Sequence, residues 1–213
     1  MSETASEARV LPLEGVRVID VSTFISGPFA TTQLAEFGAE VIKLELPVVG
    51  DPLRKFGTVT PNGDTLPWLS ECRNKKSATL DLRKPGGAEL LKRMCAEADI
   101  LVENFQPGTM EKWGIGWDVL HAINPRLIMV RISGYGQTGP YSDRPGFGTL
   151  AEAYAGAAFI SGYPDQAPLL PGFGLADSTT GLMAAYLGLV AMAEKRRTGK
   201  GQYIDLAIYE TLL

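Results

Sequence analysis

The fold class follows from one segment of the sequence, Val16 to Glu45, which reads VRVIDVSTFISGPFATTQLAEFGAEVIKLE. Its opening run, Val16–Val21, is rich in Val and Ile and is typical of a buried strand. Pro28 suits the first position of a helix and Gly38 lies just past its end, which predicts a helix over Pro28–Phe37. A second strand over Glu40–Glu45 completes a strand–helix–strand unit with a right-handed crossover.

The rest of the chain continues this alternation. Further strands are expected at Ala78–Leu82, Ile100–Glu103, Leu127–Ile132 and Tyr203–Ile208, and further helices at Pro85–Ala96, Trp117–Ile123 and Thr149–Ala157. Two segments rich in Pro, Gly and Asp, Val48–Ser70 and Gly134–Gly148, are expected to be irregular. The predicted fold is therefore an open, mostly parallel, Rossmann-like α/β sheet with helices on both faces. In such sheets ligands bind beyond the carboxyl ends of the strands.

A second informative segment, Leu169 to Arg197, leads from a glycine-rich loop into a long apolar helix. Asp177 stands where an N-cap residue is expected, and hydroxyl side chains follow it in the first turn. Residues 182–193 carry no charge, which predicts a buried helix. The three basic residues from Lys195 and then Gly199 are typical of a helix end. Asp177 is thus either a helix cap alone or a carboxylate presented to a ligand, and this segment leaves both open.

Composition narrows the class of protein. The chain has 213 residues and a formal net charge of −4, which gives no reason to expect binding to nucleic acid or to an anionic membrane surface. The acidic first nine residues do not resemble a signal peptide, so a cytoplasmic protein is expected. Cys72 and Cys95 are expected to be reduced thiols. With His121 as the single histidine, no metal site is expected.

One motif is misleading. Gly134–Gly139 reads GYGQTG and matches the dinucleotide-binding pattern G-x-G-x-x-G. That pattern requires a helix to begin at its third glycine, with the helix N-terminus facing the pyrophosphate. Pro140 and Pro145 follow instead, so no helix starts there. A nicotinamide-dependent dehydrogenase is therefore disfavoured, and the segment is interpreted as a loop near a ligand.

Basic and aromatic side chains on the loops are candidates for ligand binding. Five of them, Arg54, Lys75, Lys76, Arg83 and Lys112, fall at strand ends or in the irregular segments. Each is either a phosphate contact or a solvated surface charge. Phe105 follows a predicted strand directly and either stacks on a purine or seals the edge of the sheet.

Several motifs together resemble one family. They are Leu13–Asp20, Ser26–Pro28, Phe37–Glu45, Gly50–Pro52, Asn74–Ser77, Leu80–Leu82, Val102–Gly108, Ser133–Tyr141, Ala176–Asp177 and Arg197–Gln202. This combination resembles the family III CoA-transferases, a group that contains formyl-CoA transferase, carnitine CoA-transferase and the α-methylacyl-CoA racemases. The resemblance extends from Leu11 to the last residue.

The resemblance implies a role for Asp177 as the catalytic nucleophile. Its carboxylate would attack the thioester of a donor acyl-CoA and form a mixed anhydride, with release of the CoA thiolate. The thiolate would return to give an aspartyl-CoA thioester, from which a carboxylic acid takes the CoA through a second anhydride. A helix N-terminus would favour the ionised carboxylate, and a glycine-lined pocket would shield it from water.

The resemblance also implies where coenzyme A binds. Leu80, Asn104 and Phe105 correspond to positions around the adenine and ribose, and Arg83 and Lys112 to phosphate contacts. Phe24 and Ile25 correspond to the acyl site. Coenzyme A and acyl-CoA are then substrates, with no permanently bound cofactor.

Two departures from the family's patterns bear on the reaction. Formyl-CoA transferase has glutamine at the position of Ile25 and arginine at that of Leu46, so a formyl or oxalyl substrate is disfavoured and a less polar acyl group is expected. The racemases have histidine and aspartate at the positions of Phe147 and Gly148. His121 lies in a predicted helix far along the chain, so racemisation, which needs two acid–base groups, is disfavoured.

The resemblance implies a domain organisation. Residues 1–10 are expected to be disordered, and residues 11–213 to form the large CoA-binding domain of a chain truncated before the small domain and the C-terminal return. The full-length protein is expected to form an interlocked homodimer that binds acyl-CoA and a carboxylic acid. The 213-residue chain alone is expected to be inactive, and a non-catalytic CoA-binding protein remains the alternative.

Overall fold

The computed structural model describes residues 10–213, and the expected disorder of residues 1–10 falls, apart from Val10, outside them. Six parallel strands form one sheet in the order β3-β2-β1-β4-β5-β6. The strands are β1 (Arg17–Asp20), β2 (Glu40–Glu45), β3 (Lys76–Thr79), β4 (Ile100–Glu103), β5 (Ile128–Ser133) and β6 (Tyr203–Ala207). The α/β fold expected from the alternating pattern is confirmed.

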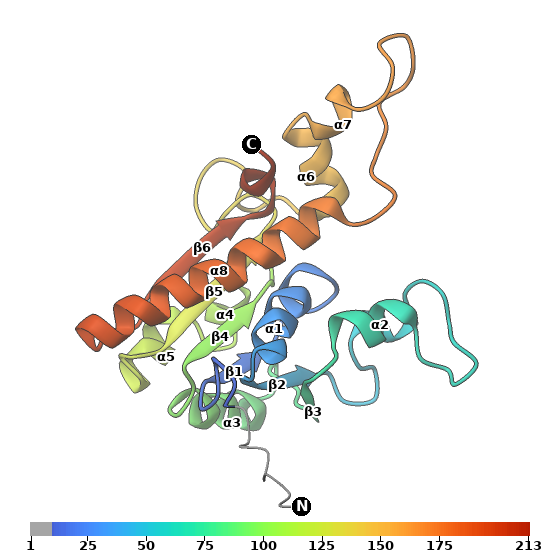
Figure 1. Ribbon diagram of the computed structural model, residues 1–213. Helices are drawn as coiled ribbons and strands as arrows, with labels where there is room; N and C mark the ends of the chain where they lie inside the picture. Colours follow the sequence, from blue (N-terminus) through green and yellow to red (C-terminus); the bar gives the residue numbers. More distant parts are fainter. Residues whose placement is uncertain (1–9) are drawn as a thin grey trace, which may run out of the picture.

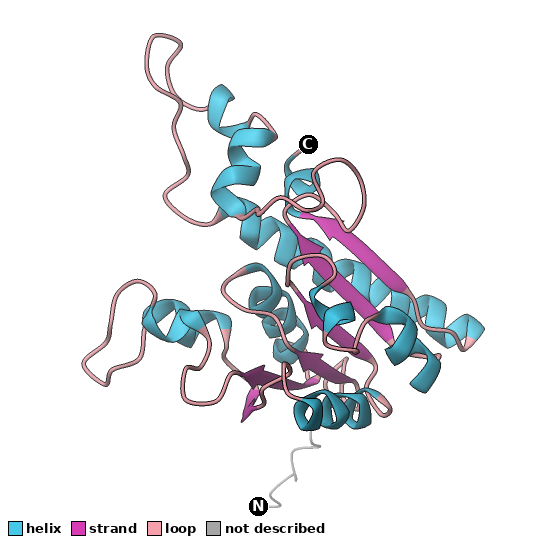
Figure 2. Ribbon diagram, turned by 180° about the vertical axis from the view of Figure 1, so that it is seen from behind, coloured by secondary structure: helices cyan, strands magenta, loops and turns pink. Residues whose placement is uncertain are grey.

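Helices cover both faces of the sheet. They are α1 (Ser26–Glu36), α2 (Leu66–Glu71), α3 (Pro85–Cys95), α4 (Thr109–Lys112), α5 (Trp117–Ile123), α6 (Gly148–Tyr154), α7 (Ala157–Ile160) and α8 (Leu175–Thr198), with short 3₁₀ helices η1 (Pro52–Lys55) and η2 (Ile208–Leu212). Figure 1 shows α1 and α8 side by side on one face, and their side chains form one hydrophobic core with the sheet. The side chains of α3, α4 and α5 form a second core on the opposite face, the side seen in Figure 2.

Close packing between α8 and α1 depends on small residues. A Cβ atom on Gly181 would lie 2.7 Å from the carbonyl oxygen of Ser26 and 2.8 Å from the ring of Phe29, so a larger residue would separate the two helices. Ala184, Ala185, Gly188 and Ala191 continue this buried face. By length and hydropathy alone α8 could also cross a membrane, but here it packs as a core helix against α1 and the sheet.

The expectation that α8 is buried all round is wrong. A strip along its other side is exposed, formed by Leu182, Met183, Tyr186, Leu189 and Val190. The absence of charge between residues 182 and 193 therefore does not mean that every side of the helix meets the core. In this helix the small side chains, together with Leu187 and Met192, face the core, and the other large apolar side chains face outward.

Other differences from the predicted elements have local causes. β3 begins at Lys76 and not at Ala78, where the strand was expected, because its position is set by pairing with β2. As an exposed edge strand, β3 has no alternation of apolar and polar residues that would mark it in the sequence. Helix α1 begins at Ser26, two residues before Pro28. The segment expected to be irregular contains η1 and α2, whose first turns are capped by Asp51 and Thr65.

A buried charge cluster lies at the carboxyl ends of β1 and β2. The ammonium group of Lys43, which is 1% exposed, lies 3.0 Å from Asp51 Oδ2 and 3.7 Å from Asp20 Oδ1. Lys75 Nζ lies 3.1 Å from Asp20 Oδ2. Asp20 also accepts hydrogen bonds from the hydroxyls of Ser22 and Thr31. Lys43, Lys75 and these hydroxyls hold the pKa of Asp20 at about 2 although burial opposes ionisation.

We predict that Lys43→Met destabilises the protein strongly. Removing this cation leaves the carboxylates of Asp20 and Asp51 buried and undercompensated, which typically costs about 3–5 kcal/mol. Lys76→Met is the matched control, because Lys76 pairs with Glu40 at the surface and its loss should cost no more than about 1 kcal/mol. Denaturant unfolding of the full-length variants measures both, and equal losses would contradict the structural role of the cluster.

Candidate active site

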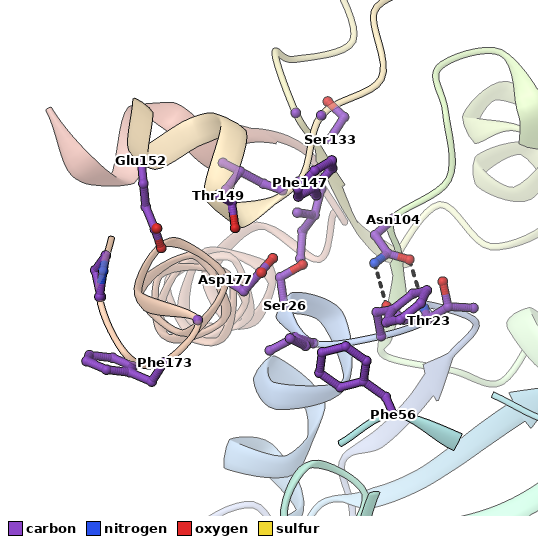
Figure 3. Close-up of a pocket in the computed structure, with 18 of the residues that line it drawn as sticks. Thr23, Ser26, Phe56, Asn104, Ser133, Phe147, Thr149, Glu152, Phe173 and Asp177 are labelled. Carbon is purple, nitrogen blue, oxygen red and sulfur yellow. Dashed lines mark hydrogen bonds between the residues drawn. The ribbon is translucent and has the colours of Figure 1, made fainter. Parts of the chain in front are cut away.

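A large cavity lies at the point where the strand order of the sheet reverses. Its volume is about 840 Å³, and the loops that follow β1, β4 and β5 line it together with α6 and the start of α8. β1 and β4 are neighbours, but the chain leaves them for opposite halves of the sheet, so their loops diverge and leave a crevice. Figure 3 shows Thr23, Asn104, Ser133 and Asp177 converging on this space from four segments of the chain.

Asp177 presents its carboxylate to this cavity but does not cap α8. The helix begins at Leu175, its N-cap residue is Gly174, and Asp177 is the third helical residue. The backbone N–H of Ala176 is instead satisfied by Glu152 of α6, whose Oε1 accepts it at 3.1 Å. The expectation that Asp177 stands at the N-cap is therefore wrong. Its carboxylate is free of that structural role because a residue of another helix performs it.

Gly148 allows a close approach to this carboxylate. A Cβ atom at position 148 would lie 2.3 Å from Asp177 Oδ2, so a side chain there would force the Asp177 carboxylate to move. The first turn of α6 therefore lies directly against the Asp177 side chain in the first turn of α8.

The surroundings of Asp177 make it more basic than an ordinary aspartate. Burial and the nearby negative charge of Glu152 raise its pKa to about 6, and the N–H of Gly148 opposes this shift. The carboxylate is therefore still mostly ionised at neutral pH. A carboxylate of raised basicity in a sheltered cavity is suited to nucleophilic attack.

The loops after β1 and β4 are joined by Asn104. Its side-chain oxygen accepts the N–H of Thr23 at 2.8 Å, and its side-chain nitrogen donates to the carbonyl of Thr23 at 2.7 Å (Figure 3). This pair of bonds extends the pairing of β1 with β4 by one step. Asn104 lines the cavity, but its amide is engaged in holding the two loops together.

A smaller cavity of about 250 Å³ adjoins this region. Leu80, Arg83 and Phe105 line it together with Trp113, whose ring meets that of Phe105 edge-on at 5.1 Å. Phe105 lines both cavities, and its backbone N–H donates to Glu103 Oε2 at 2.7 Å. The structure thus brings together residues 80, 83 and 105, which are far apart in the sequence.

The predicted binding residues do not all gather in these cavities. Phe24 lines the larger cavity, and a positive φ of 59° directs its ring to an edge-on contact with Phe56. Arg83 is exposed and forms a two-point ion pair with Asp81. Lys112 is exposed at the end of α4 and lines neither cavity.

Three further basic residues that were candidates for phosphate binding have structural partners. Lys75 is buried against Asp20. Arg54 pairs with Glu45 and stacks on Trp68, and Lys76 pairs with Glu40. The sequence shows that these residues lie near strand ends or in an irregular segment, but not that a carboxylate lies opposite each of them.

Glu152 is a buried charged residue of this site that the sequence motifs do not single out as a candidate. It is 3% exposed and lines the cavity beside Asp177. A signal was available, because it is the single charged residue between Gly146 and Tyr163, in a helix otherwise built of small and apolar residues. Within residues 10–213 no group of three or more His, Cys, Asp and Glu side chains is arranged to hold a metal ion.

Comparison with known proteins identifies relatives of this architecture. The family described as CoA-transferase family III matches residues 13–213. The beta and alpha subunits of the succinyl-CoA–L-malate CoA-transferase of Chloroflexus aurantiacus are 57% and 52% identical over 95% and 100% of this chain, which covers 50% of each. The chain thus spans about half the length of the curated relatives it matches.

A solved structure shares the fold. A CAIB/BAIF family protein from Brucella suis superposes with a TM-score of 0.91 at 36% identity, over 96% of this chain and 55% of that one. The similarity includes the sheet and the helices that position Asp177, and the family match covers every strand described above. The chain belongs to the family III CoA-transferases.

Proposed function

We propose that this chain carries the CoA-binding region and the nucleophile of a CoA-transferase. One observation supports this function above all: the half-buried carboxylate of Asp177 has no capping role and faces a cavity large enough for an acyl thioester. In the first step an Asp177 oxygen attacks the thioester carbonyl carbon, and the C–S bond breaks. The products are an acyl-aspartyl anhydride and the CoA thiolate, so the negative charge moves from Asp177 to sulfur.

The two adjoining cavities suit the two ends of coenzyme A. In the proposed complex the adenine lies in the smaller cavity against Leu80 and Phe105, and Arg83 at its mouth meets the phosphates. The pantetheine arm passes Thr23, which lines both cavities, and brings the thioester to Asp177. Phe105 then separates the nucleotide from the reacting end.

The acyl part of the proposed site has aromatic walls and neutral polar groups. Phe24, Phe56, Phe147 and Phe173 line the larger cavity, and no Lys, Arg or His is among its described lining residues. The hydroxyl of Ser133 is buried without a partner in the described chain, so it is available to hydrogen-bond an acyl substituent. The names of the two relatives given above include succinyl-CoA, which supports succinyl-CoA as the first donor to test.

The racemase alternative lacks support from the site. Phe147 and Gly148, which occupy the positions of the racemases' histidine and aspartate, have no titratable side chain. His121 stacks on Trp117 at a centroid distance of 4.4 Å in α5, on the opposite face of the sheet.

The exposed strip of α8 supports a second part of the proposal, a homodimer of the full-length protein. Sedimentation of the full-length protein tests this.

We predict that Asp177→Ala abolishes CoA transfer in the full-length protein but changes the dissociation constant for CoA by less than about tenfold, because the nucleotide site lies in the other cavity. Stopped assays of transfer and calorimetric titration with CoA measure the two effects. Hydroxylamine added during turnover of the wild type should convert Asp177 to a hydroxamate that mass spectrometry detects.

Two variants control this experiment. Asp118→Ala removes an exposed aspartate from the first turn of α5 and should leave transfer unchanged. Phe105→Ala should weaken CoA binding by about tenfold or more, since stacking of a base on an aromatic ring contributes roughly 1–3 kcal/mol. Transfer by Asp177→Ala at a near wild-type rate would refute the proposed function.

We predict that succinyl-CoA is a better donor than formyl-CoA, with kcat/KM higher by about tenfold or more. This factor corresponds to the effect of roughly one good hydrogen bond to the acyl group. Ile25 offers no side-chain hydrogen bond to a formyl group, the aromatic walls favour a longer acyl chain, and the unpartnered Ser133 hydroxyl is available to the succinyl carboxylate. Initial rates with both donors and a common acid acceptor measure this ratio. A preference for formyl-CoA would show that the walls do not select the acyl group.

A further inference from the structure

Two contacts join α6 to the first turn of α8. The N–H of Ala176 donates to Glu152 Oε1 at 3.1 Å, and Gly148 lies so close to Asp177 that an added Cβ atom would be 2.3 Å from Asp177 Oδ2. Gly148 and Glu152 are one helical turn apart, and Ala176 and Asp177 are consecutive. The two carboxylates are therefore fixed on the same side of the cavity, as Figure 3 shows.

No positive charge among the described residues compensates this pair. Glu152 and Asp177 are the two charged residues among those that line the cavity. Glu210 of η2, which packs against both helices, is exposed and lines a different cavity. Charged groups on the other neighbouring elements are engaged elsewhere: Glu36 of α1 with Arg73, Arg131 of β5 with Glu103 and Glu111, Asp205 of β6 with the N–H of Gln137, and Lys195 of α8 with Asp99.

We propose that Glu152 is a positioning residue that holds the first turn of α8 so that Asp177 faces the cavity, and whose negative charge makes Asp177 a stronger nucleophile. This inference rests on the proposed function of Asp177. Glu152 occupies the position of a helix cap in space, although it comes from another helix. Burial of its carboxylate costs free energy, and a neutral side chain could accept the Ala176 N–H without that cost, so the cap alone does not explain the charge.

The charge of Glu152 acts on the first chemical step. Together with burial it raises the pKa of Asp177 to about 6, which increases the basicity of the attacking oxygen. When the anhydride forms, Asp177 loses its charge and the repulsion from Glu152 disappears. The repulsion thus destabilises the reactant carboxylate but not the acylated state, and it lowers the barrier to acylation.

The Glu152→Gln variant separates charge from positioning, because its amide oxygen can still accept the Ala176 N–H. In the full-length enzyme we expect the acid limb of the kcat/KM profile, near pH 6 in the wild type, to move to lower pH. At pH 7.5 the acylation rate should fall by about threefold to tenfold, because a less basic carboxylate attacks more slowly. An unchanged acid limb and an unchanged rate would overturn the inference.

Controls distinguish this effect from a loss of stability. Glu194→Gln removes the same charge from the far end of α8 and should leave the profile unchanged. Glu152→Leu removes the hydrogen bond as well and should lower the thermal stability in addition. A purely structural role predicts that Glu152→Gln behaves as the wild type and that Glu152→Leu alone is impaired.

A measurement on the wild type keeps the inference testable if the variants do not fold. Carbon NMR of aspartate-labelled protein, with Asp177→Asn to assign the signal, should show Asp177 titrating near pH 6. A midpoint near 4 would overturn the inference. If Asp177→Ala is inactive while Glu152→Gln retains the wild-type profile, the proposed function stands and the role of Glu152 falls.

Discussion

The structure depends on one constraint, the burial of paired charges at the carboxyl edge of the sheet. Lys43 lies between Asp20 and Asp51, and Lys75 completes the pairing of Asp20. Each charge would be very costly to bury alone, so the residues must fold together. Asp51 also accepts the N–H of Phe24 at 3.3 Å, and Asp20 accepts the N–H of Ser22. The cluster therefore fixes the loop after β1, and this loop forms one wall of the cavity. Stability and site geometry are coupled through the same carboxylates.

The rest of the cavity is organised by hydrogen bonds between side chains and backbone groups. Asn104 mimics a backbone pair with Thr23 and keeps the loops after β1 and β4 together. At the start of α8, Glu152 of another helix satisfies the N–H of Ala176, so Asp177 remains free. A helix N-terminus needs a hydrogen-bond acceptor, but the acceptor need not be local in sequence. Glu152 therefore makes the structural contact with the helix, and the carboxylate of Asp177 stays available for chemistry.

Buried elements of this fold are predictable from local sequence, and exposed ones are less so. β2, β4 and α5 have the predicted bounds, because a buried strand or an amphipathic helix has a strong local pattern. The edge strand β3 was misplaced, since its register comes from β2 and its own residues are exposed. The absence of charge in α8 was correctly interpreted as a long helix but wrongly as complete burial. An apolar sequence predicts that a helix is buried at least in part, but only the tertiary structure shows which side of the helix packs against the protein.

The sequence by itself determined the parallel α/β sheet, the family and the placement of Asp177 at the start of a long helix. These follow from local periodicity, turn residues and contiguous motifs, which are all properties of neighbours along the chain. Only the tertiary structure decided that Glu152 accepts the N–H of Ala176, that Lys75 is buried against Asp20, and that Gly148 touches the carboxylate of Asp177. These contacts join residues 24 to 55 positions apart or depend on an approach between two helices, and the free energy of a buried charge depends on what lies opposite it in space.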